Sequence, residues 1–445
     1  MALKVCSVEV TEHISDIVLT SEETGAFCLV TYRGRPIGDL WFEARSIIPS
    51  EVIKQRIAEH FGTRILAEHF EDRLLGELRS GYQPRIRDQE GNLPIVSVVV
   101  CTKDRPEDLL RCLKSLCKQT YPRIEIIVVD NASTGDHTRK IAESQGVRYV
   151  REDRKGLDFA RNRGIRESSG SFVAFADDDV MVSPQWVDEL VRGFSDESIV
   201  CVTGLTMPAE LRTEAQLLFE RYGTGGFRKG YVSRVVDRFS IPPPAAGAVG
   251  AGANMAFRKE IFDHIGLFDE ALDCGTPTLA AGDVDVFCRM LSAGYRMRYQ
   301  PTAIAWHKHR MNMDALERQL FGYGVAVYAF FTKRVFECHD LDALHLAGRY
   351  FIRWLIPQAV TSILRRNPLP FSLTGRELLG SLLGPYAYLK GKAYVSEIRT
   401  REGTERRCPS KYTCLRDIIM LARRFGGGGR HAHASFGYCG RSNAQ

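Results

Sequence analysis

The spacing of apolar and polar positions separates a first segment, residues 1–80, from the rest of the chain. Two β-rich runs within 26–41 flank a Gly-containing turn and predict a hairpin. Helical spacing follows over about 50–62 and again over 65–78, and Gly62 is expected to separate the two helices. We therefore expect a small N-terminal α+β domain.

From residue 95 onward, continuous apolar runs alternate with segments of helical spacing. The apolar runs have the character of parallel strands covered on both faces and lie at 95–101, 124–129, 147–150 and 172–176. This βαβαβαβ series predicts an open parallel α/β sheet, with ligands at the carboxyl ends of its strands. We expect the sheet domain to span 95–335, after a polar, Pro-containing linker at 81–94.

The last third of the chain has a different pattern. Amphipathic helical spacing over 345–364 and 375–388, with arginines beside apolar positions, predicts a helical C-terminal region over 336–400. Residues 401–445 are rich in Arg and Gly and are expected to be a basic, disordered tail. Basic amphipathic helices suit a peripheral membrane contact. A helical cap on the sheet domain is the alternative, and the pattern leaves both open.

The composition of the chain says more about its cellular location and its partners than about its activity. The chain has 445 residues, is 44% hydrophobic and carries a net charge of +6. It lacks the basic start and apolar core of a secretion signal, and its twelve cysteines are spread out without a C-x-x-C pair. Reduced thiols and a cytoplasmic location are therefore expected. The modest positive charge suits an anionic small molecule or an anionic membrane, and no nucleic-acid motif is present, so no nucleic-acid partner is expected.

Three adjacent carboxylates, Asp177, Asp178 and Asp179, follow directly after an apolar strand. Because like charges repel, their proximity costs free energy unless a cation offsets it. Oxygen ligands at a strand end suit Mg²⁺ or Mn²⁺ together with a substrate phosphate. A solvated acidic turn is the alternative. Asp130 ends the second strand, where it can accept hydrogen bonds from a base or ribose, or cap a turn.

Several ordered elements resemble the family 2 glycosyltransferases, which have the GT-A fold. The resemblance covers roughly residues 94–335. Its elements are Val96 to Pro106, Val129 to Ser133, Gly156 to Gly164, Asp177 to Asp179, Gly252 to Arg258, Gly266 to Glu270, Gly282 to Asp285 and Trp306 to Arg310. The resemblance implies a GT-A type nucleotide-sugar-binding sheet, flanked here by the small N-terminal domain and the helical C-terminal extension.

The resemblance also implies donor-binding roles. Thr102 and Asp130 correspond to positions that hold the nucleotide base and ribose, and Arg161 and Asn162 to a helix start beside the donor. The Asp-x-Asp element corresponds to Asp177 and Asp179, which would contact the ribose and a metal ion bridging the donor diphosphate. We count Asp178, between them, among the donor-binding residues.

The family's catalytic base corresponds to Asp283. The family has a Glu-Asp pair here, whereas this chain has Gly282 followed by Asp283. Asp285 lies two residues further on and is the second candidate. Either carboxylate could instead be a favourable charge at a helix N-terminus.

Two further positions complete the candidate site. His307, followed by His309 after a predicted strand, is a candidate metal ligand by the family match, and a structural histidine is the alternative. Asn254 lies in a run of small residues where the backbone can approach a ligand closely. Contact with the donor sugar or the acceptor is one interpretation of Asn254, and tight strand packing is the other.

The sequence thus predicts an inverting glycosyltransferase that moves a sugar from a nucleotide-sugar, UDP-sugar before dTDP- or GDP-sugar, to a hydroxyl acceptor in polysaccharide or glycoconjugate synthesis. Mn²⁺ or Mg²⁺ is the expected cofactor, and the acceptor is an unidentified glycan or lipid-linked molecule. A nucleotidyltransferase is an alternative, although the first strand is followed by Thr102 to Pro106 with no glycine. A catalytically inactive GT-A-like subunit of a glycan assembly complex is the other.

Overall fold

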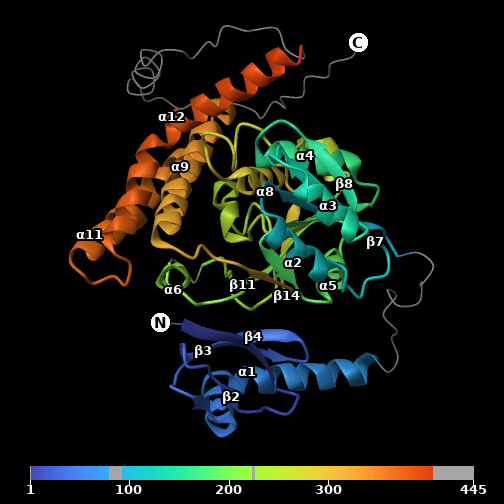
Figure 1. Cartoon of the computed structure of the whole chain (residues 1–445), viewed down its shortest axis with the longest axis vertical. Coiled ribbons are helices and arrows are strands. Elements are labelled where there is room, and N and C mark those ends of the chain that lie inside the picture. The colour runs from blue at the N-terminus through green and yellow to red at the C-terminus, as the bar shows by residue number, and fades with distance from the viewer. Residues whose placement is uncertain (1, 80–92, 223–225, 404–445) are drawn as a thin grey trace. The chain divides into compact units, whose positions relative to one another are not determined.

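The computed structural model describes residues 2–79, 93–222 and 226–403 (Figure 1). The predicted linker and the predicted basic tail lie almost entirely outside the described residues. Residues 1–395 form one compact unit, and 396–445 a second. Among the described helices, none combines the length and the apolar character needed to cross a membrane.

The largest sheet has nine strands in the order β10-β14-β11-β13-β9-β6-β7-β8, and β12 pairs with β14. The strands are β6 (Val96–Thr102), β7 (Ile124–Asn131), β8 (Arg148–Glu152), β9 (Phe172–Asp177), β10 (Val180–Val182), β11 (Ile199–Pro208), β12 (Arg234–Val236), β13 (Asn254–Arg258) and β14 (Arg296–His307). Strands β9, β6, β7 and β8 are mutually parallel, which confirms the predicted βαβαβαβ series. Strand β13 runs antiparallel to both β9 and β11, so the sheet is mixed rather than wholly parallel.

Helices cover both faces of this sheet (Figure 1). The helices of this region are α2 (Pro106–Leu116), α3 (His137–Ser144), α4 (Leu157–Glu167), α5 (Trp186–Gly193), α6 (Glu214–Glu220), η1 (Pro243–Ala248), α7 (Ile261–Ile265), α8 (Gly282–Ser292) and α9 (Met313–Cys338). Alternate residues of β6 point to opposite faces of the sheet. Val98 and Val100 pack with α2 and α5, whereas Val99 packs with α4, α8 and α9. Burial on both faces explains why the strands are continuous apolar runs.

The first segment is a three-stranded sheet, a two-stranded sheet and one helix. The predicted hairpin is β3 (Glu23–Tyr32) and β4 (Arg35–Glu43); β1 (Ala2–Glu9) lies parallel to β3, and β2 (Ile17–Val18) pairs with β5 (Ile47–Ile48). The prediction of two helices was wrong, since α1 (Ser50–Arg79) is continuous through Gly62. A glycine inside a helix costs about 1 kcal/mol and does not have to end it.

The first segment shares apolar contacts with the large sheet. Phe27 and Leu29 of β3 pack with Leu205 and Met207 of β11 in one buried cluster. The Tyr231 hydroxyl also donates a hydrogen bond to Asp39 of β4. The first segment therefore packs against β11, which pairs directly with β14, the strand that carries His307.

The C-terminal helices are α10 (Leu341–Tyr350), a π-helical turn η2 (Phe351–Leu355), α11 (Ile356–Ile363) and α12 (Phe371–Arg401). Helix α12 packs closely on α9, where the glycines permit backbone approach. A side chain at Gly380 would lie 2.1 Å from the Phe321 carbonyl oxygen, and one at Gly384 would lie 2.4 Å from Cβ of Tyr328. Part of the predicted helical region therefore does cover the sheet domain.

Candidate active site

The carboxyl ends of three parallel strands meet at one edge of the sheet. Cys101 of β6 pairs with Asp177 at the end of β9, and Thr102 pairs with Asp130 at the end of β7. The sheet register therefore brings together residues that lie far apart in the sequence. The predicted positions Thr102, Asp130 and Asp177 share this edge.

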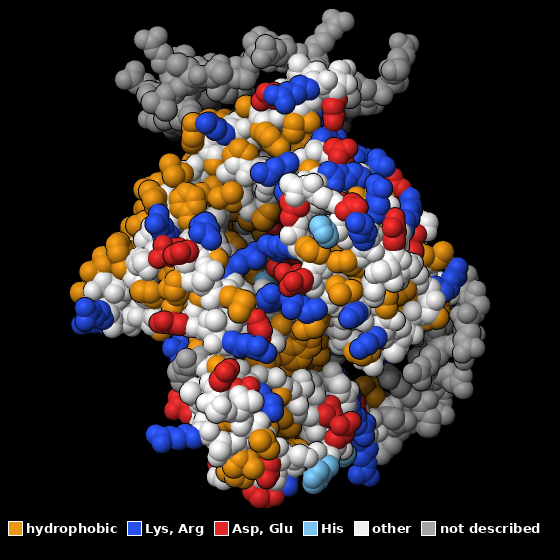
Figure 2. Space-filling view, viewed as in Figure 1, with side chains coloured by type: hydrophobic (Ala, Val, Ile, Leu, Met, Phe, Trp, Pro, Cys, Tyr) orange, Lys and Arg blue, Asp and Glu red, His pale blue; other side chains and the backbone are white. Residues whose placement is uncertain are grey.

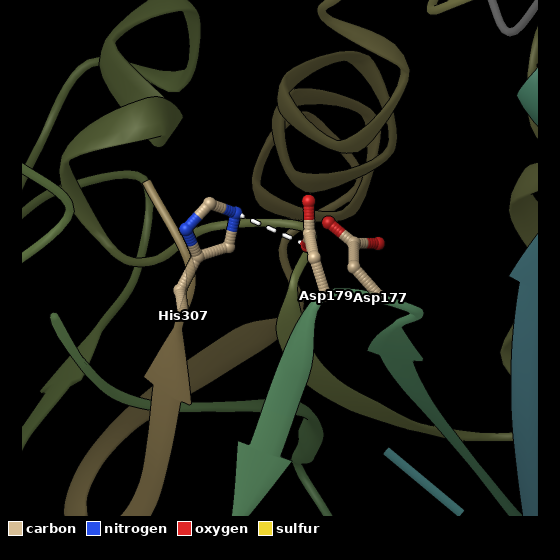
Figure 3. Close-up of side chains that lie close together, drawn as sticks. All are labelled: Asp177, Asp179 and His307. Carbon is tan, nitrogen blue, oxygen red and sulfur yellow. Dashed lines mark ion pairs between the residues drawn. The ribbon is translucent and has the colours of Figure 1, made fainter. Parts of the chain in front are cut away.

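Asp177, Asp179 and His307 form a group that can hold a metal ion. One ligand atom from each of the three lies within 4.8 Å of the others. Strand β14 pairs antiparallel with β10, which opposes His307 to Val180 and so places the imidazole beside the acidic turn. His307 Nε2 lies 3.3 Å from Asp179 Oδ1 (Figure 3).

The protonation of this group suits a cation. Burial raises the pKa of Asp177 to about 7. The negative charges of Asp179 and Asp178 also raise this pKa, and the positive charge of Arg161 opposes the rise. Burial lowers the pKa of His307 to about 4, despite the opposing effect of Asp179. The imidazole is therefore neutral near pH 7 and has a lone pair for a metal. A cation would displace the proton that Asp177 otherwise retains.

Two arginines and a threonine that flank the acidic turn complete its environment. Arg105 Nη1 lies 3.1 Å from both Asp178 Oδ1 and Asp179 Oδ2, and Thr102 donates a 2.7 Å hydrogen bond to Asp178 Oδ2. Arg310 lies 3.7 Å from Asp179 Oδ2. Burial alone would raise the pKa of Asp179, but His307, Arg105 and Arg310 outweigh burial and lower it. Sequence reasoning gave Arg105 no role, although it directly precedes the N-terminal proline of α2.

A buried polar chain leads away from His307. Its Nδ1 lies 3.1 Å from Nδ1 of His309, and His309 Nε2 lies 2.6 Å from Glu220 Oε1. Glu220 is also ion-paired with Arg228 at 2.7 Å. For two neutral imidazoles, one tautomer set satisfies the contacts among His307, His309 and Glu220: His309 donates from Nε2 to Glu220 and accepts at Nδ1 from His307. This set leaves Nε2 of His307 unprotonated and facing Asp179, as a metal ligand requires.

Asp283 and Asp285 lie in the first turn of α8 but in different surroundings. Asp283 is partly exposed, and its Oδ2 accepts a 2.6 Å hydrogen bond from the Gly252 amide. Burial and the charge of Asp273, opposed by Arg161, raise its pKa. Asp285 is fully buried and ion-paired with Arg289 and Lys333 at 2.8 Å each. Only Asp283 is therefore placed to meet a substrate.

Gly282 and Gly252 are positions of close approach around Asp283. A Cβ at 282 would lie 2.0 Å from Asp158 Oδ2, and a Cβ at 252 would lie 2.8 Å from Arg161 Nη2 and 3.1 Å from Asp283 Oδ2. The departure from the family's Glu-Asp pair is therefore accommodated by the side chain of Asp158, which occupies the space beside Gly282.

Arg161 and Asn162 on α4 are buried and form hydrogen bonds with neighbouring protein groups. Arg161 Nη1 lies 2.9 Å from Asp158 Oδ1 and 2.5 Å from Asp273 Oδ2. Asn162 exchanges hydrogen bonds with the backbone of Phe268 at 2.9 and 3.0 Å. Arg161 still bears on the site, because its charge opposes the pKa rise of both Asp177 and Asp283.

Asp130 and Asn254 are buried, and their side chains bond to protein groups. Asp130 has no exposed surface and accepts from the Ser133 amide, the Tyr149 hydroxyl and Arg151. Asn254 is likewise unexposed: its amide donates to the carbonyls of Leu205 and Ala303 and accepts from Trp186 Nε1 at 2.8 Å. The Asn254 side chain ties β13 to β11, β14 and α5, which fits the strand-packing alternative.

Comparisons with known proteins agree with this geometry. The family model described as Glycosyl transferase family 2 matches residues 97–266. Glycosyltransferase AglE of Haloferax volcanii is 28% identical over 235 residues, which cover 51% of this chain and 71% of the relative. The Glucosyl-dolichyl phosphate glucuronosyltransferase of the same organism is 24% identical over 257 residues, 54% of this chain and 77% of the relative.

Among solved structures, the mannosyltransferase PcManGT from Pyrobaculum calidifontis, in complex with GDP-Man and Mn²⁺, is similar with a TM-score of 0.40 and 17% identity, covering 83% of this chain and 89% of the other.

The mixed sheet with an Asp-x-Asp turn at its carboxyl edge defines the GT-A class of nucleotide-sugar-dependent glycosyltransferases. Residues 97–266, which include β6, β7, β9 and the Asp-x-Asp turn, are similar to glycosyl transferase family 2, and the two relatives named above are glycosyltransferases. The protein is therefore an enzyme of the glycosyltransferase class that uses a nucleotide-sugar donor.

Proposed function

We propose that the protein is an inverting, metal-dependent glycosyltransferase that moves a sugar from a UDP-sugar to a hydroxyl acceptor. The observation that carries the proposal is the grouping of Asp177, Asp179 and His307 within 4.8 Å at the carboxyl edge of the sheet, where open α/β folds bind their ligands. Two carboxylates and an imidazole suit Mn²⁺ better than Mg²⁺, which favours oxygen ligands and retained waters.

The residues around the acidic turn would hold the donor diphosphate. A divalent ion held by Asp177, Asp179 and His307 would supply Lewis-acid stabilisation of the leaving diphosphate. Arg105 and Arg310, which neutralise Asp178 and Asp179 in this structure, are positioned to turn toward phosphate oxygens and form charge-assisted hydrogen bonds with them. A UDP-sugar is the first donor class to test, before GDP- and dTDP-sugars.

Asp283 would remove the proton from the attacking acceptor hydroxyl. The Gly252 amide fixes the orientation of its carboxylate, and its raised pKa makes it a stronger base than an exposed aspartate. A single displacement with one base inverts the configuration at the anomeric carbon. Asp285 has no part in this step, because both its oxygens face cations inside the fold.

The acceptor that we propose to test first is a lipid-linked glycan. One relative is named for a glucosyl-dolichyl phosphate substrate. Synthesis of a polysaccharide or glycoconjugate in the cytoplasm would fit such an acceptor, and free cysteines throughout the described residues suit a reducing compartment.

The test is Mn²⁺-dependent release of nucleotide from a panel of UDP-, GDP- and dTDP-sugars, together with thermal stabilisation by each donor. We expect one donor class to stabilise the protein and to be hydrolysed, and Asp179→Asn to abolish both effects. Asp153→Asn, an exposed aspartate away from the group, is the matched control. If Mn²⁺ and a donor bind but no nucleotide is released, the inactive binding subunit is the correct assignment.

A further inference from the structure

The C-terminal helices have two apolar sides, and only one of them is covered. Ala343, Ala347, Leu355, Ala359 and Leu373 are buried on the inner side. The outer side carries large aliphatic residues at helical spacing that face solvent: Leu341, Leu344, Ile352, Ile356, Val360, Ile363, Leu364, Leu379, Leu382 and Leu383. Ile352, Ile363 and Leu382 are 66%, 60% and 63% exposed. Figure 2 shows hydrophobic side chains gathered over the region of α11 and α12.

The same surface is basic. All seven Lys and Arg residues between 341 and 395 are exposed, whereas of the two acidic residues there Asp342 is exposed and Glu377 is buried. Arg349 and Arg353 lie beside Ile352, and Arg365 and Arg366 directly follow Leu364. These four arginines make no ion pair within the described part of the chain. Aliphatic stripes bordered by arginines and nearly free of acids match an anionic bilayer in both apolar character and charge.

The chain's own last segment is a poor match for this surface. Residues 404–445 contain eight Lys and Arg and two acidic residues, so they carry the same sign of charge as the helices. A protein partner would have to offer an aliphatic and acidic face. A bilayer with anionic headgroups offers both features, and exposed apolar stripes on a helix surface mark an interaction site.

We propose that the outer side of α10, η2, α11 and α12, called here the outer helical face, binds peripherally to an anionic lipid bilayer. The aliphatic side chains insert to the level of the headgroup–acyl boundary, and Arg349, Arg353, Arg365 and Arg366 contact lipid phosphates. The proposal goes beyond the proposed function and does not depend on the assignment of the active site.

The experiment is co-sedimentation of the full chain with vesicles of phosphatidylcholine alone or mixed with phosphatidylglycerol. We expect binding to the anionic vesicles and little to the neutral ones. Replacing four arginines of the face with glutamine should lower the partition coefficient at least ~10-fold; they are Arg349, Arg353, Arg365 and Arg366. The matched control replaces four exposed arginines elsewhere with glutamine: Arg45, Arg56, Arg166 and Arg238.

The apolar contribution is tested separately. Ile352→Ser, Ile363→Ser and Leu382→Ser combined should weaken vesicle binding ~10-fold or more, whereas serine at the exposed control positions Phe70, Val232 and Phe239 should not. A chain that stays in the supernatant with anionic vesicles overturns the proposal, as does equal sedimentation of face and control variants. A dimer that the apolar variant converts to a monomer, with vesicle binding unchanged, would assign the face to a second copy instead. Nucleotide release without vesicles is expected to be unaffected by every variant, so failure here is distinct from failure of the proposed function.

Discussion

Replacing His309 with phenylalanine should weaken Mn²⁺ binding while leaving the fold intact. In the tautomer set inferred above, Nδ1 of His309 accepts a hydrogen bond from Nδ1 of His307, 3.1 Å away, and this bond keeps the proton off Nε2 of His307. Without the acceptor, His307 can take the tautomer with a protonated Nε2, which cannot bind a metal ion. Phenylalanine fills a similar volume, and its ring would remain packed against Phe219, whose centroid lies 4.7 Å from that of His309.

The expected loss of Mn²⁺ affinity follows from the role of His309 as the hydrogen-bond partner of a metal ligand. Loss of a hydrogen-bond partner of a metal ligand typically costs ~10- to 100-fold in metal affinity, or ~1.4 to 2.7 kcal/mol. The change should leave the buried Glu220 carboxylate paired, because Arg228 remains 2.7 Å away. His309→Asn, which can offer an acceptor close to the position of Nδ1, should restore most of the affinity.

The assay is isothermal titration with Mn²⁺, with the melting temperature of the metal-free protein as a measure of folding. Glu220→Gln should also weaken binding, since a neutral acceptor holds the His309 proton less firmly. Glu377→Gln is the matched control: this glutamate is also buried, but it accepts hydrogen bonds from Tyr222 and Tyr350 and not from a histidine. Unchanged Mn²⁺ affinity in folded His309→Phe, or an equal loss in the Glu377 variant, would refute the tautomer argument.

Three further outcomes are expected. Asp283→Asn should lower kcat by ~10²- to 10⁴-fold with Mn²⁺ affinity retained. A kcat close to that of the unaltered enzyme would show that Asp283 is not the catalytic base. Asn254→Ala leaves two buried carbonyls without their donor, which costs ~1 to 3 kcal/mol each, so it should lower the melting temperature without changing the donor KM; a raised KM at an unchanged melting temperature would contradict this. Because the pKa of Asp177 is raised to about 7, Mn²⁺ binding should release a proton below that pH and little above it. Calorimetry in buffers of different ionisation enthalpy measures the release, and an affinity that does not change between pH 6 and pH 8 would count against it.

The strands of the site were predictable because they are buried on both faces. Val96–Thr102, Ile124–Asn131 and Phe172–Asp177 are mostly apolar, and the polar residue that ends each strand marks the ligand edge. The antiparallel strand β13 was less visible, since a five-residue strand among small residues has no distinctive periodicity. Its pairing with β9 depends on tertiary contacts, among them the hydrogen bonds of Asn254.

Roles of single residues were harder to predict than the positions of strands. Asp283 and Asp285 are two residues apart on one helix, and only the fold shows that Lys333, almost fifty residues later, neutralises Asp285. Arg105, just before α2, and Glu220, at the end of α6, reach the site through contacts with residues more than seventy positions away. Such pairings have no local signal, so sequence spacing alone could not have identified them.

Diffraction from crystals grown with Mn²⁺ and a UDP-sugar, recorded at a wavelength where manganese scatters anomalously, tests the central claim most directly. The account predicts one manganese peak within bonding distance of Nε2 of His307 and of a carboxylate oxygen of Asp177 or Asp179, with the donor diphosphate as a further ligand. No peak at this edge, with Asp179 still paired to Arg105 and the donor bound elsewhere, would contradict it.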